Sequence, residues 1–243
     1  MKVIAVIPAR LASTRLPRKM LREIAGVPLL ALTYQAVRRC SELDEVVVAT
    51  DSDEISEFCQ RRGFGVRMTS PAHRSGTERT HEISTIFPAD VYIDVQGDEP
   101  LTRPEHISML IGVMRSPEVE VGTLKTWAAD IDINNPGAIK VVTDTAGRAL
   151  YFSRATIPFD RDGAHPRYYK HLGIYGYRKD ALDKFVGWPE SSLERSERLE
   201  QLRFLENGIP IYVAETPFDT VGVDTEEDVL RVQEILRQRS PER

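Results

Sequence analysis

Cysteine is scarce in this sequence, and long apolar runs are missing. Cys40 and Cys59 are the only two cysteines among 243 residues, and their spacing matches no metal-binding or redox motif, so we expect two buried free thiols. The first apolar run, Val3–Ile7, stops at Pro8, and no run approaches the roughly 18 residues that a membrane span needs. We therefore expect a soluble, cytoplasmic protein with no export leader and no membrane insertion.

The common signatures of nucleotide-binding and hydrolytic enzymes are absent as well. No G-x-x-x-x-G-K-[ST] segment occurs, and no G-x-G-x-x-G segment follows an apolar run, which disfavours a P-loop ATPase and a standard dinucleotide dehydrogenase. No G-x-S-x-G segment occurs, and the five histidines lack the spacing of a zinc site. A phosphate-binding loop in this chain would have to be of another kind.

The net charge of −5 conceals an uneven distribution. The first 40 residues hold eight lysines or arginines and one acid, and five of these cations lie between Arg10 and Arg22. A mildly acidic chain with one basic loop does not suit general binding to nucleic acid, which requires a basic face overall. It suits a site for a small anion.

The first half of the chain alternates regularly between nearly continuous apolar runs and apolar residues at helical spacing. Such runs are typical of strands that are buried on both faces, and the alternation predicts right-handed βαβ units. The predicted elements, strand and helix in turn, are 2–9, 28–40, 45–50, 52–62, 65–68, 77–87, 91–96 and 104–114.

The second half is richer in strands. Its predicted strands are 119–127, 139–143, 149–153, 170–178 and 209–214, and its predicted helices are 192–206 and 226–239. We expect a single α/β domain over residues 1–243, with a mixed, mostly parallel sheet flanked by helices and a small insertion near 120–180. Ligands of such a sheet bind beyond the carboxyl ends of its parallel strands.

A basic loop follows the carboxyl end of the first predicted strand. The segment PARLASTRLPRK (8–19) supplies Arg10, Arg15 and Lys19 together with the hydroxyl of Ser13. Each guanidinium group can donate two parallel hydrogen bonds to phosphate oxygens, whereas a lysine acts as a mobile point charge. The alternative is a solvated basic loop, and its place after the first strand favours the anion site.

Two aspartates follow short segments that contain valine and glycine. Asp98 lies in VQGDEP (95–100), after the fourth predicted strand, and Asp224 lies in TVGVDT (220–225). Carboxylates at the edge of a sheet are suited to Mg²⁺, which takes one or two of them together with phosphate oxygens of a substrate. The alternatives are an Asx turn for Asp98 and an N-cap of the last helix for Asp224.

Two further groups of polar residues have both a structural and a functional interpretation. Ser75, Gly76 and Thr77 offer hydrogen bonds for a nucleobase, although the same sequence would serve as a helix cap. Glu200 and Gln201 flank the leucine stripe of the predicted helix 192–206, where they would reach either a pocket or water.

Segments along nearly the whole chain resemble the sugar nucleotidyltransferases and, among them most closely, the 3-deoxy-manno-octulosonate (Kdo) cytidylyltransferase family. One departure is Arg18-Lys19-Met20, where the wider superfamily typically has Gly-Lys-Pro. The matching segments are IPARLASTRLPRK (7–19), VVVATDSDEI (46–55), MTSPAHRSGTER (68–79), VQGDEP (95–100), KVV (140–142), ALYFSRATIPFDRD (149–162), KHLGIYGYR (170–178), LERSERLEQLRFLENG (193–208) and GVDTEED (222–228).

The resemblance implies a fold and a reaction. The fold is Rossmann-like, of the nucleotide-diphospho-sugar transferase type, with a small inserted dimerisation and sugar-binding sub-domain near 120–180. The reaction is CTP + Kdo → CMP-Kdo + pyrophosphate, dependent on Mg²⁺ and catalysed by a homodimer that feeds lipopolysaccharide or capsule synthesis. In-line attack of this kind depends on positioning and on charge neutralisation.

The resemblance also implies roles for individual residues. Lys19, Asp98, Asp224 and Arg15 correspond to catalytic positions, with Asp98 and Asp224 as the metal ligands. The positions that correspond to CTP-binding residues are Pro8, Ala9, Arg10, Ser13, Arg15, Lys19, Ser75, Gly76 and Thr77. Those that correspond to the sugar pocket are Gln96, Arg154, His171, Tyr175, Glu200 and Gln201.

Two alternatives remain open for the function. A cytidylyltransferase that acts on another 2-keto sugar acid, such as 8-amino-8-deoxy-Kdo or a sialic-acid-like sugar, would carry the same motifs. A catalytically silent nucleotide-binding protein with the same fold is the second alternative, and the presence of both aspartates beside the basic loop argues against it.

Overall fold

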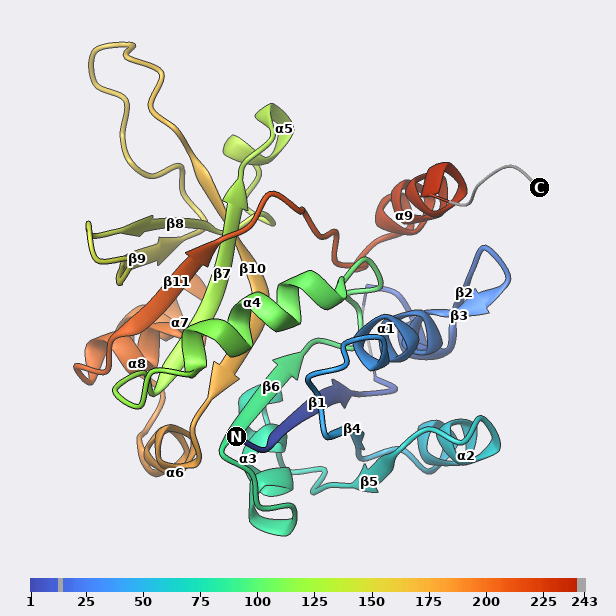
Figure 1. Ribbon diagram of the computed structural model, residues 1–243. Helices are drawn as coiled ribbons and strands as arrows, with labels where there is room; N and C mark the ends of the chain where they lie inside the picture. The colour runs from blue at the N-terminus through green and yellow to red at the C-terminus, as the bar shows by residue number, and fades with distance from the viewer. Residues whose placement is uncertain (13–14, 240–243) are drawn as a thin grey trace.

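A mixed sheet of nine strands forms the centre of the protein (Figure 1). The structure is a computed structural model that describes residues 1–12 and 15–239. The main path of the sheet runs β11-β7-β10-β6-β1-β4-β5, and β8 and β9 join it beside β10. The strands are β1 (Val3–Ala9), β4 (Glu45–Thr50), β5 (Val66–Met68), β6 (Val91–Val95), β7 (Val121–Trp127), β8 (Lys140–Thr143), β9 (Ala149–Ser153), β10 (Tyr169–Tyr177) and β11 (Ile211–Glu215).

Strands β6, β1, β4 and β5 pair in parallel, as do β7 and β11, whereas β10 runs antiparallel between β6 and β7. Every residue of β1 and of β6 is buried, which explains why both are nearly continuous apolar runs, with Asp94 as the one charged residue. The prediction of a mixed, mostly parallel sheet flanked by helices is confirmed.

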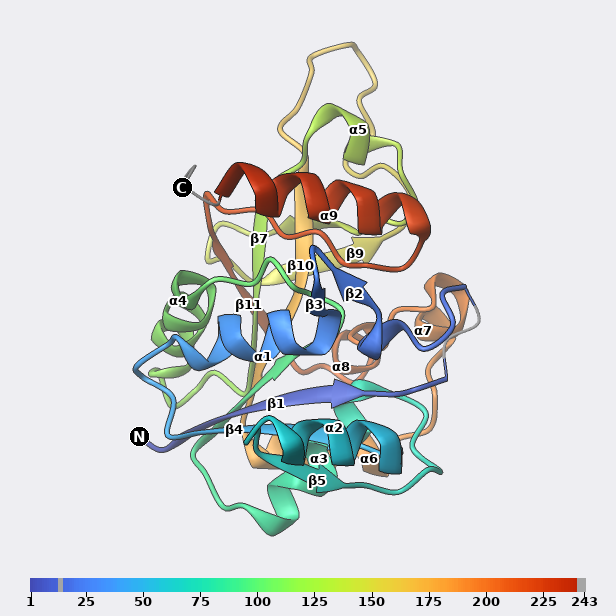
Figure 2. The same cartoon turned by 90° about the vertical axis from the view of Figure 1, so that its right-hand side faces the viewer.

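Helices cover both faces of the sheet (Figures 1 and 2). Buried side chains of α1, α2 and α4 share one hydrophobic cluster with the sheet, and those of α3, α6 and α8 share another. A third cluster packs α9 against the short β2–β3 hairpin and the start of α1. The helices are α1 (Leu29–Arg38), α2 (Asp53–Arg61), α3 (Gly76–Ile86), α4 (Pro104–Met114), α5 (Asp130–Ile133), α6 (Lys179–Gly187), α7 (Ser192–Glu197), α8 (Leu202–Glu206) and α9 (Glu226–Arg239), and the hairpin is β2 (Glu23–Ile24) and β3 (Val27–Pro28).

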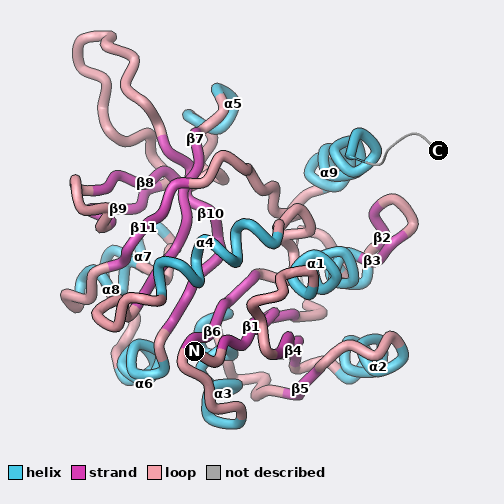
Figure 3. Tube along the Cα trace, viewed as in Figure 1, coloured by secondary structure: helices cyan, strands magenta, loops and turns pink. Residues whose placement is uncertain are grey.

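The segment near 120–180 has two parts. Its strands β7 and β10 belong to the main path of the sheet, and β8 and β9 join the sheet beside β10, off that path. The long loop before β10 extends away from the sheet (Figures 1 and 3). A separate sub-domain in this segment stays a prediction.

The predicted helix 192–206 is wrong in one respect, because the structure has two short helices there. Arg198 adopts a left-handed backbone conformation with φ of 55° and ends α7, and α8 starts at Leu202. Helix α6 and the β2–β3 hairpin are not among the predicted elements. Both cysteines are buried and free, as expected, and burial raises the pKa of Cys59 to about 12.

Candidate active site

The segments that follow β1 and β6 border a cavity of about 1270 Å³. Pro8, Ala9, Arg10, Lys19, Gly76 and Thr77 are not among the residues that line it, and Ser13 lies outside the described residues. The predicted site residues that line the cavity are Arg15, Ser75, Gln96, Asp98, Arg154, His171, Tyr175, Glu200, Gln201 and Asp224. The fold therefore gathers residues from most of the chain length at one edge of the sheet.

Asp98 and Asp224 meet at Lys19. The Lys19 ammonium group lies 2.5 Å from an oxygen of Asp98 and 2.9 Å from an oxygen of Asp224. Arg15 binds the other oxygen of Asp224 at 2.9 Å. Burial alone would raise the pKa of Asp224, but the bonds and charges of Lys19 and Arg15 outweigh it and lower that pKa.

The structural alternatives for the two aspartates are not what the structure shows. Thr225, not Asp224, caps α9: its hydroxyl accepts a bond from the Asp228 amide, and the Asp228 carboxylate accepts one from the Thr225 amide. The Asp98 carboxylate accepts a bond from Lys19, whereas an Asx turn would need one from the backbone of its own turn. Both carboxylates are thus oriented toward the basic loop.

The turn that presents Lys19 depends on Arg18. Arg18 has φ of 55°, a left-handed conformation that glycine adopts at little cost. Arg18 stands where the wider superfamily typically has glycine, so the backbone of the turn is retained although the residue differs. The Arg18 side chain forms an exposed ion pair with Glu54.

The start of α3 approaches the end of β6 closely. Ser75 caps α3 through a bond from the Glu78 amide, so the capping interpretation of this segment is confirmed. A Cβ atom at Gly76 would lie 2.8 Å from Nε2 of Gln96, so glycine allows the two segments to meet. Gln96 in turn donates a 2.7 Å bond to the buried Asp94.

His171 and Tyr175 lie on β10, where an irregularity between Leu172 and Tyr175 shifts the pairing with β7. Nε2 of His171 lies 2.9 Å from the Thr123 hydroxyl, which donates to the Ile174 carbonyl at 2.8 Å. We therefore assign the proton to Nε2, which leaves Nδ1 as an acceptor. Burial lowers the pKa of His171 to about 3, so the ring is neutral at physiological pH.

Arg154 fastens the segment between α7 and α8. Its guanidinium group donates to the carbonyls of Glu197, Pro136 and Arg198 at 2.6, 3.0 and 3.3 Å. A guanidinium has five N–H donors, so donors remain for an anion in the cavity. Arg154 therefore both shapes the cavity wall and offers it a positive charge.

Glu200 and Gln201 occupy the break between α7 and α8, not one continuous helix. Gln201 is buried, and Oε2 of Glu200 is buried without a bonding partner among the described residues. Burial raises the pKa of Glu200, and the hydroxyls of Ser75 and Thr77 partly oppose this rise. Both residues face the cavity, so of the two interpretations the pocket is correct.

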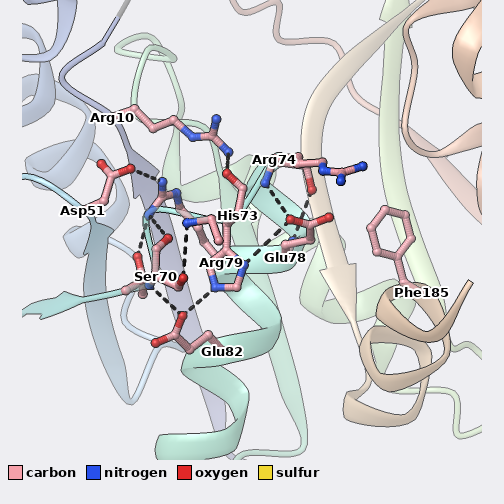
Figure 4. A network of polar contacts seen from close by, with 12 residues as sticks. Arg10, Asp51, Ser70, His73, Arg74, Glu78, Arg79, Glu82 and Phe185 are labelled. Atoms are coloured by element: carbon pink, nitrogen blue, oxygen red, sulfur yellow. Dashed lines mark hydrogen bonds and ion pairs between the residues drawn. The ribbon is translucent and has the colours of Figure 1, made fainter. Parts of the chain in front are cut away.

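Arg10 connects the basic loop to a polar network at the start of α3 (Figure 4). It donates a 2.6 Å bond to the His73 carbonyl, and His73 lies 2.5 Å from Glu82. The fully buried Arg79 binds Asp51 at 2.5 Å. Burial and the charge of Arg79 lower the pKa of Arg10. No spacing in the sequence identifies the His73–Glu82 and Arg79–Asp51 pairs, and neither was predicted.

Glu99 is a further cavity residue that the sequence did not reveal. Its Oε1 lies 3.0 Å from where a Cβ atom at Gly222 would be, and its Oε2 has no bonding partner among the described residues. Burial, with the charge of Asp98, raises its pKa to about 8. Its position next to Asp98 was the one feature of the sequence that could have identified it as a cavity residue.

Over the described part of the chain, no group of three or more His, Cys, Asp or Glu could hold a metal ion by itself. Two carboxylates within bonding distance of one ammonium group are instead the donor set that Mg²⁺ uses when phosphate oxygens complete its shell. Asp98 and Asp224 fit that requirement. In residues 1–12 and 15–239, no helix is long and apolar enough to cross a membrane.

The fold and this arrangement define a nucleotidyltransferase, and comparison with known proteins agrees. A family model described as cytidylyltransferase matches residues 4–214. A solved structure of CMP:2-keto-3-deoxy-manno-octonic acid synthetase complexed with CTP superposes with a TM-score of 0.94, at 40% identity over 99% of this chain and 100% of that one.

Two curated relatives identify the family within the cytidylyltransferases. The 3-deoxy-manno-octulosonate cytidylyltransferase of Koribacter versatilis is 62% identical over 98% of this chain and 92% of its own length. That of Acidobacterium capsulatum is 51% identical over 98% of both. This chain belongs to the 3-deoxy-manno-octulosonate cytidylyltransferase family.

Proposed function

We propose that this enzyme transfers the cytidylyl group of CTP to 3-deoxy-D-manno-octulosonate, releasing pyrophosphate. The observation that supports this most directly is the convergence of Asp98 and Asp224 on Lys19, beside Arg15, at the edge of the cavity. The sugar 2-hydroxyl oxygen forms the new bond to the α-phosphorus and loses its proton, while the bond to pyrophosphate breaks on the opposite side.

The nucleotide side of the cavity binds CTP. Arg15 and Lys19 neutralise the charge that develops on the departing pyrophosphate, with Arg10 and Ser13 as further triphosphate ligands. The backbone of Pro8 and Ala9 borders the nucleotide, and Ser75, Gly76 and Thr77 contact cytosine and ribose. The close approach of Gly76 to Gln96 is consistent with a base lying beside the sugar pocket.

The sugar side recognises an acidic polyol. Arg154 pairs with the carboxylate of the sugar acid through the donors that the backbone leaves over. Nδ1 of His171 accepts a bond from a sugar hydroxyl, and the buried oxygen of Glu200 accepts another. Gln96, Tyr175 and Gln201 complete the lining.

Asp98 and Asp224 would hold Mg²⁺ together with phosphate oxygens of the bound nucleotide. When bound, the metal would lower the pKa of the attacking hydroxyl and offset phosphate charge. Asp98 follows β6 and Asp224 lies in the turn before α9, and both carboxylates bond to the same ammonium group, so the fold keeps the two ligands close together.

The enzyme acts as a cytoplasmic homodimer, and its product feeds lipopolysaccharide or capsule synthesis. Large apolar side chains on the β8–β9 side of the molecule are exposed, as a dimer interface requires. They are Trp127, Ile131, Leu150 and Phe159, with exposed fractions of 47, 71, 62 and 86%.

Pyrophosphate release from CTP in the presence of Mg²⁺ tests this function. Kdo, 8-amino-8-deoxy-Kdo and a sialic acid are compared at equal concentrations, and we expect the highest kcat/KM with Kdo. A higher value with another sugar acid would assign that substrate instead. Absence of turnover with all three, while CTP still binds, would favour the catalytically silent alternative.

A further inference from the structure

Lys19 occupies the position between the two carboxylates that we assign to Mg²⁺. Its ammonium group bonds to both, at 2.5 and 2.9 Å, so it lies where a cation shared by Asp98 and Asp224 would lie. A role for Lys19 in controlling that position rests on the proposed function, because the metal site belongs to it.

Lys19 is less exposed than either of the two aspartates to which it bonds. The Lys19 side chain is 9% exposed, whereas those of Asp98 and Asp224 are 25% and 45% exposed. Arg15 binds the second oxygen of Asp224. The two negative charges are thus already balanced by two positive ones, which greatly weakens the attraction for an approaching divalent cation.

The backbone of Lys19 is anchored, but its side chain can move. Lys19 begins the short 3-10 helix Lys19–Leu21, and the next residue, Arg22, forms an ion pair with Glu226 at 2.7 Å. A lysine side chain has a flexible four-carbon stem, so the ammonium group can be displaced while the turn stays in place.

We propose that Lys19 is a built-in counter-ion that keeps divalent metal from binding before the nucleotide. The triphosphate of CTP attracts Lys19 and Arg15, exposes the two carboxylates and supplies further oxygen ligands. Metal and nucleotide therefore bind with positive coupling, and by linkage each raises the affinity for the other by the same factor. The enzyme would not be held in a metal-loaded, nucleotide-free form.

Binding of Mn²⁺ to the nucleotide-free enzyme, followed by electron paramagnetic resonance, tests this proposal. The neutral variants Lys19→Met and Lys19→Gln should bind Mn²⁺ at least about ten-fold more tightly than the wild type, because a positive charge close to the dication is removed. Lys19→Arg keeps the charge and should stay within about two-fold of the wild type. Arg22→Met, which removes a cation from the same loop without touching either aspartate, is the matched control.

The same titration with a non-reactive CTP analogue completes the experiment. The analogue should raise the Mn²⁺ affinity of the wild type by a larger factor than that of Lys19→Met, since the variant has no counter-ion to displace. Unchanged Mn²⁺ affinity in both neutral variants would overturn the counter-ion role while leaving the proposed activity intact. If Asp98→Asn bound Mn²⁺ like the wild type in the presence of the analogue, the metal site itself would be wrong, and the counter-ion role with it.

Discussion

The two sides of the cavity differ in how their polar groups carry charge. On the nucleotide side, Lys19, Asp98, Asp224 and Arg15 are charged, paired and in part exposed. On the sugar side, burial opposes charge: it lowers the pKa of His171 to about 3 and raises that of Asp94 to about 7. Fixed charges suit a triphosphate and a metal, whereas neutral, oriented hydrogen-bonding groups suit the hydroxyls of a sugar, with Arg154 left for its carboxylate.

The largest effect is expected at the carboxylate pair. Asp98→Asn should lower kcat by at least about 10³-fold, because it removes a negative charge from the metal site while preserving shape. Its free energy of unfolding should change by no more than about 1 kcal/mol, since the partly exposed ion pair contributes little to stability. Pyrophosphate release and urea unfolding measure the two quantities, and kcat close to that of the wild type would contradict the metal assignment.

Loss of the lysine should have the next largest effect. Lys19→Ala should reduce kcat by about 10²-fold or more, as the removal of one preorganised donor does elsewhere. Arg22→Ala, three residues away and paired with the exposed Glu226, should leave kcat within about two-fold of the wild type. Equal losses in the two variants would show that only the overall charge of the loop matters.

Gly76→Ala tests where the two sides meet. The added Cβ would lie 2.8 Å from Nε2 of Gln96 and displace it from its bond with Asp94. Loss of one such hydrogen bond should raise KM for the sugar acid by about ten-fold, with a smaller change in KM for CTP. Gly112→Ala on α4, where an added Cβ meets nothing within 4 Å, is the control and should leave both constants unchanged.

His171 should make the stability of the sugar side depend on pH. Its folded pKa of about 3 lies below the unfolded value of 6.5, so below pH 6.5 the unfolded state binds more protons and stability falls. Between pH 6.5 and 5, His171→Gln should therefore gain about 2 kcal/mol relative to the wild type in urea unfolding.

Asp94→Asn provides a control of opposite sign. Burial raises the folded pKa of Asp94 from 3.8 to about 7, so the stability that its protonated form contributes is present below pH 3.8 and lost as the pH rises toward 7. Relative to the wild type, Asp94→Asn should lose stability as the pH falls through this range. Parallel slopes for the two variants would mean that these residues do not control the pH dependence.

The smallest effect is expected at the two left-handed arginines, one on each side of the cavity. Arg18 and Arg198 both have φ of 55°. Arg18→Gly and Arg198→Gly should each change the free energy of unfolding by no more than about 1 kcal/mol, because glycine tolerates this conformation but adds disorder to the unfolded chain. Arg18→Val should cost about 1–2 kcal/mol more than Arg18→Gly. Equal stability of the two Arg18 variants in urea unfolding would contradict the left-handed backbone conformation of Arg18.

The elements that the sequence predicts well are those whose pattern depends on local burial. The strands at 45–50 and 91–96 agree with β4 and β6 to within one residue, because both are buried apolar runs. The segment 192–206 is predicted as one helix, since its leucines follow helical spacing. Tertiary contacts override that spacing: Leu199 turns into the core, and Arg154 binds the carbonyls of Glu197 and Arg198.

By itself, the sequence determined most of the strands and helices in their order, the basic loop after the first strand and the two aspartates that follow glycine-containing segments, because these are local patterns of burial, charge and turn formation. Only the tertiary structure decided that Asp98 and Asp224, 126 residues apart, meet at one ammonium group. It also decided that Thr225 caps the last helix, that Arg154 shapes the wall of the cavity, and that Glu99 lines the cavity with one carboxylate oxygen buried. Distances between remote segments and the burial of individual carboxylates depend on how the sheet brings strand ends together, and no spacing along the chain encodes them.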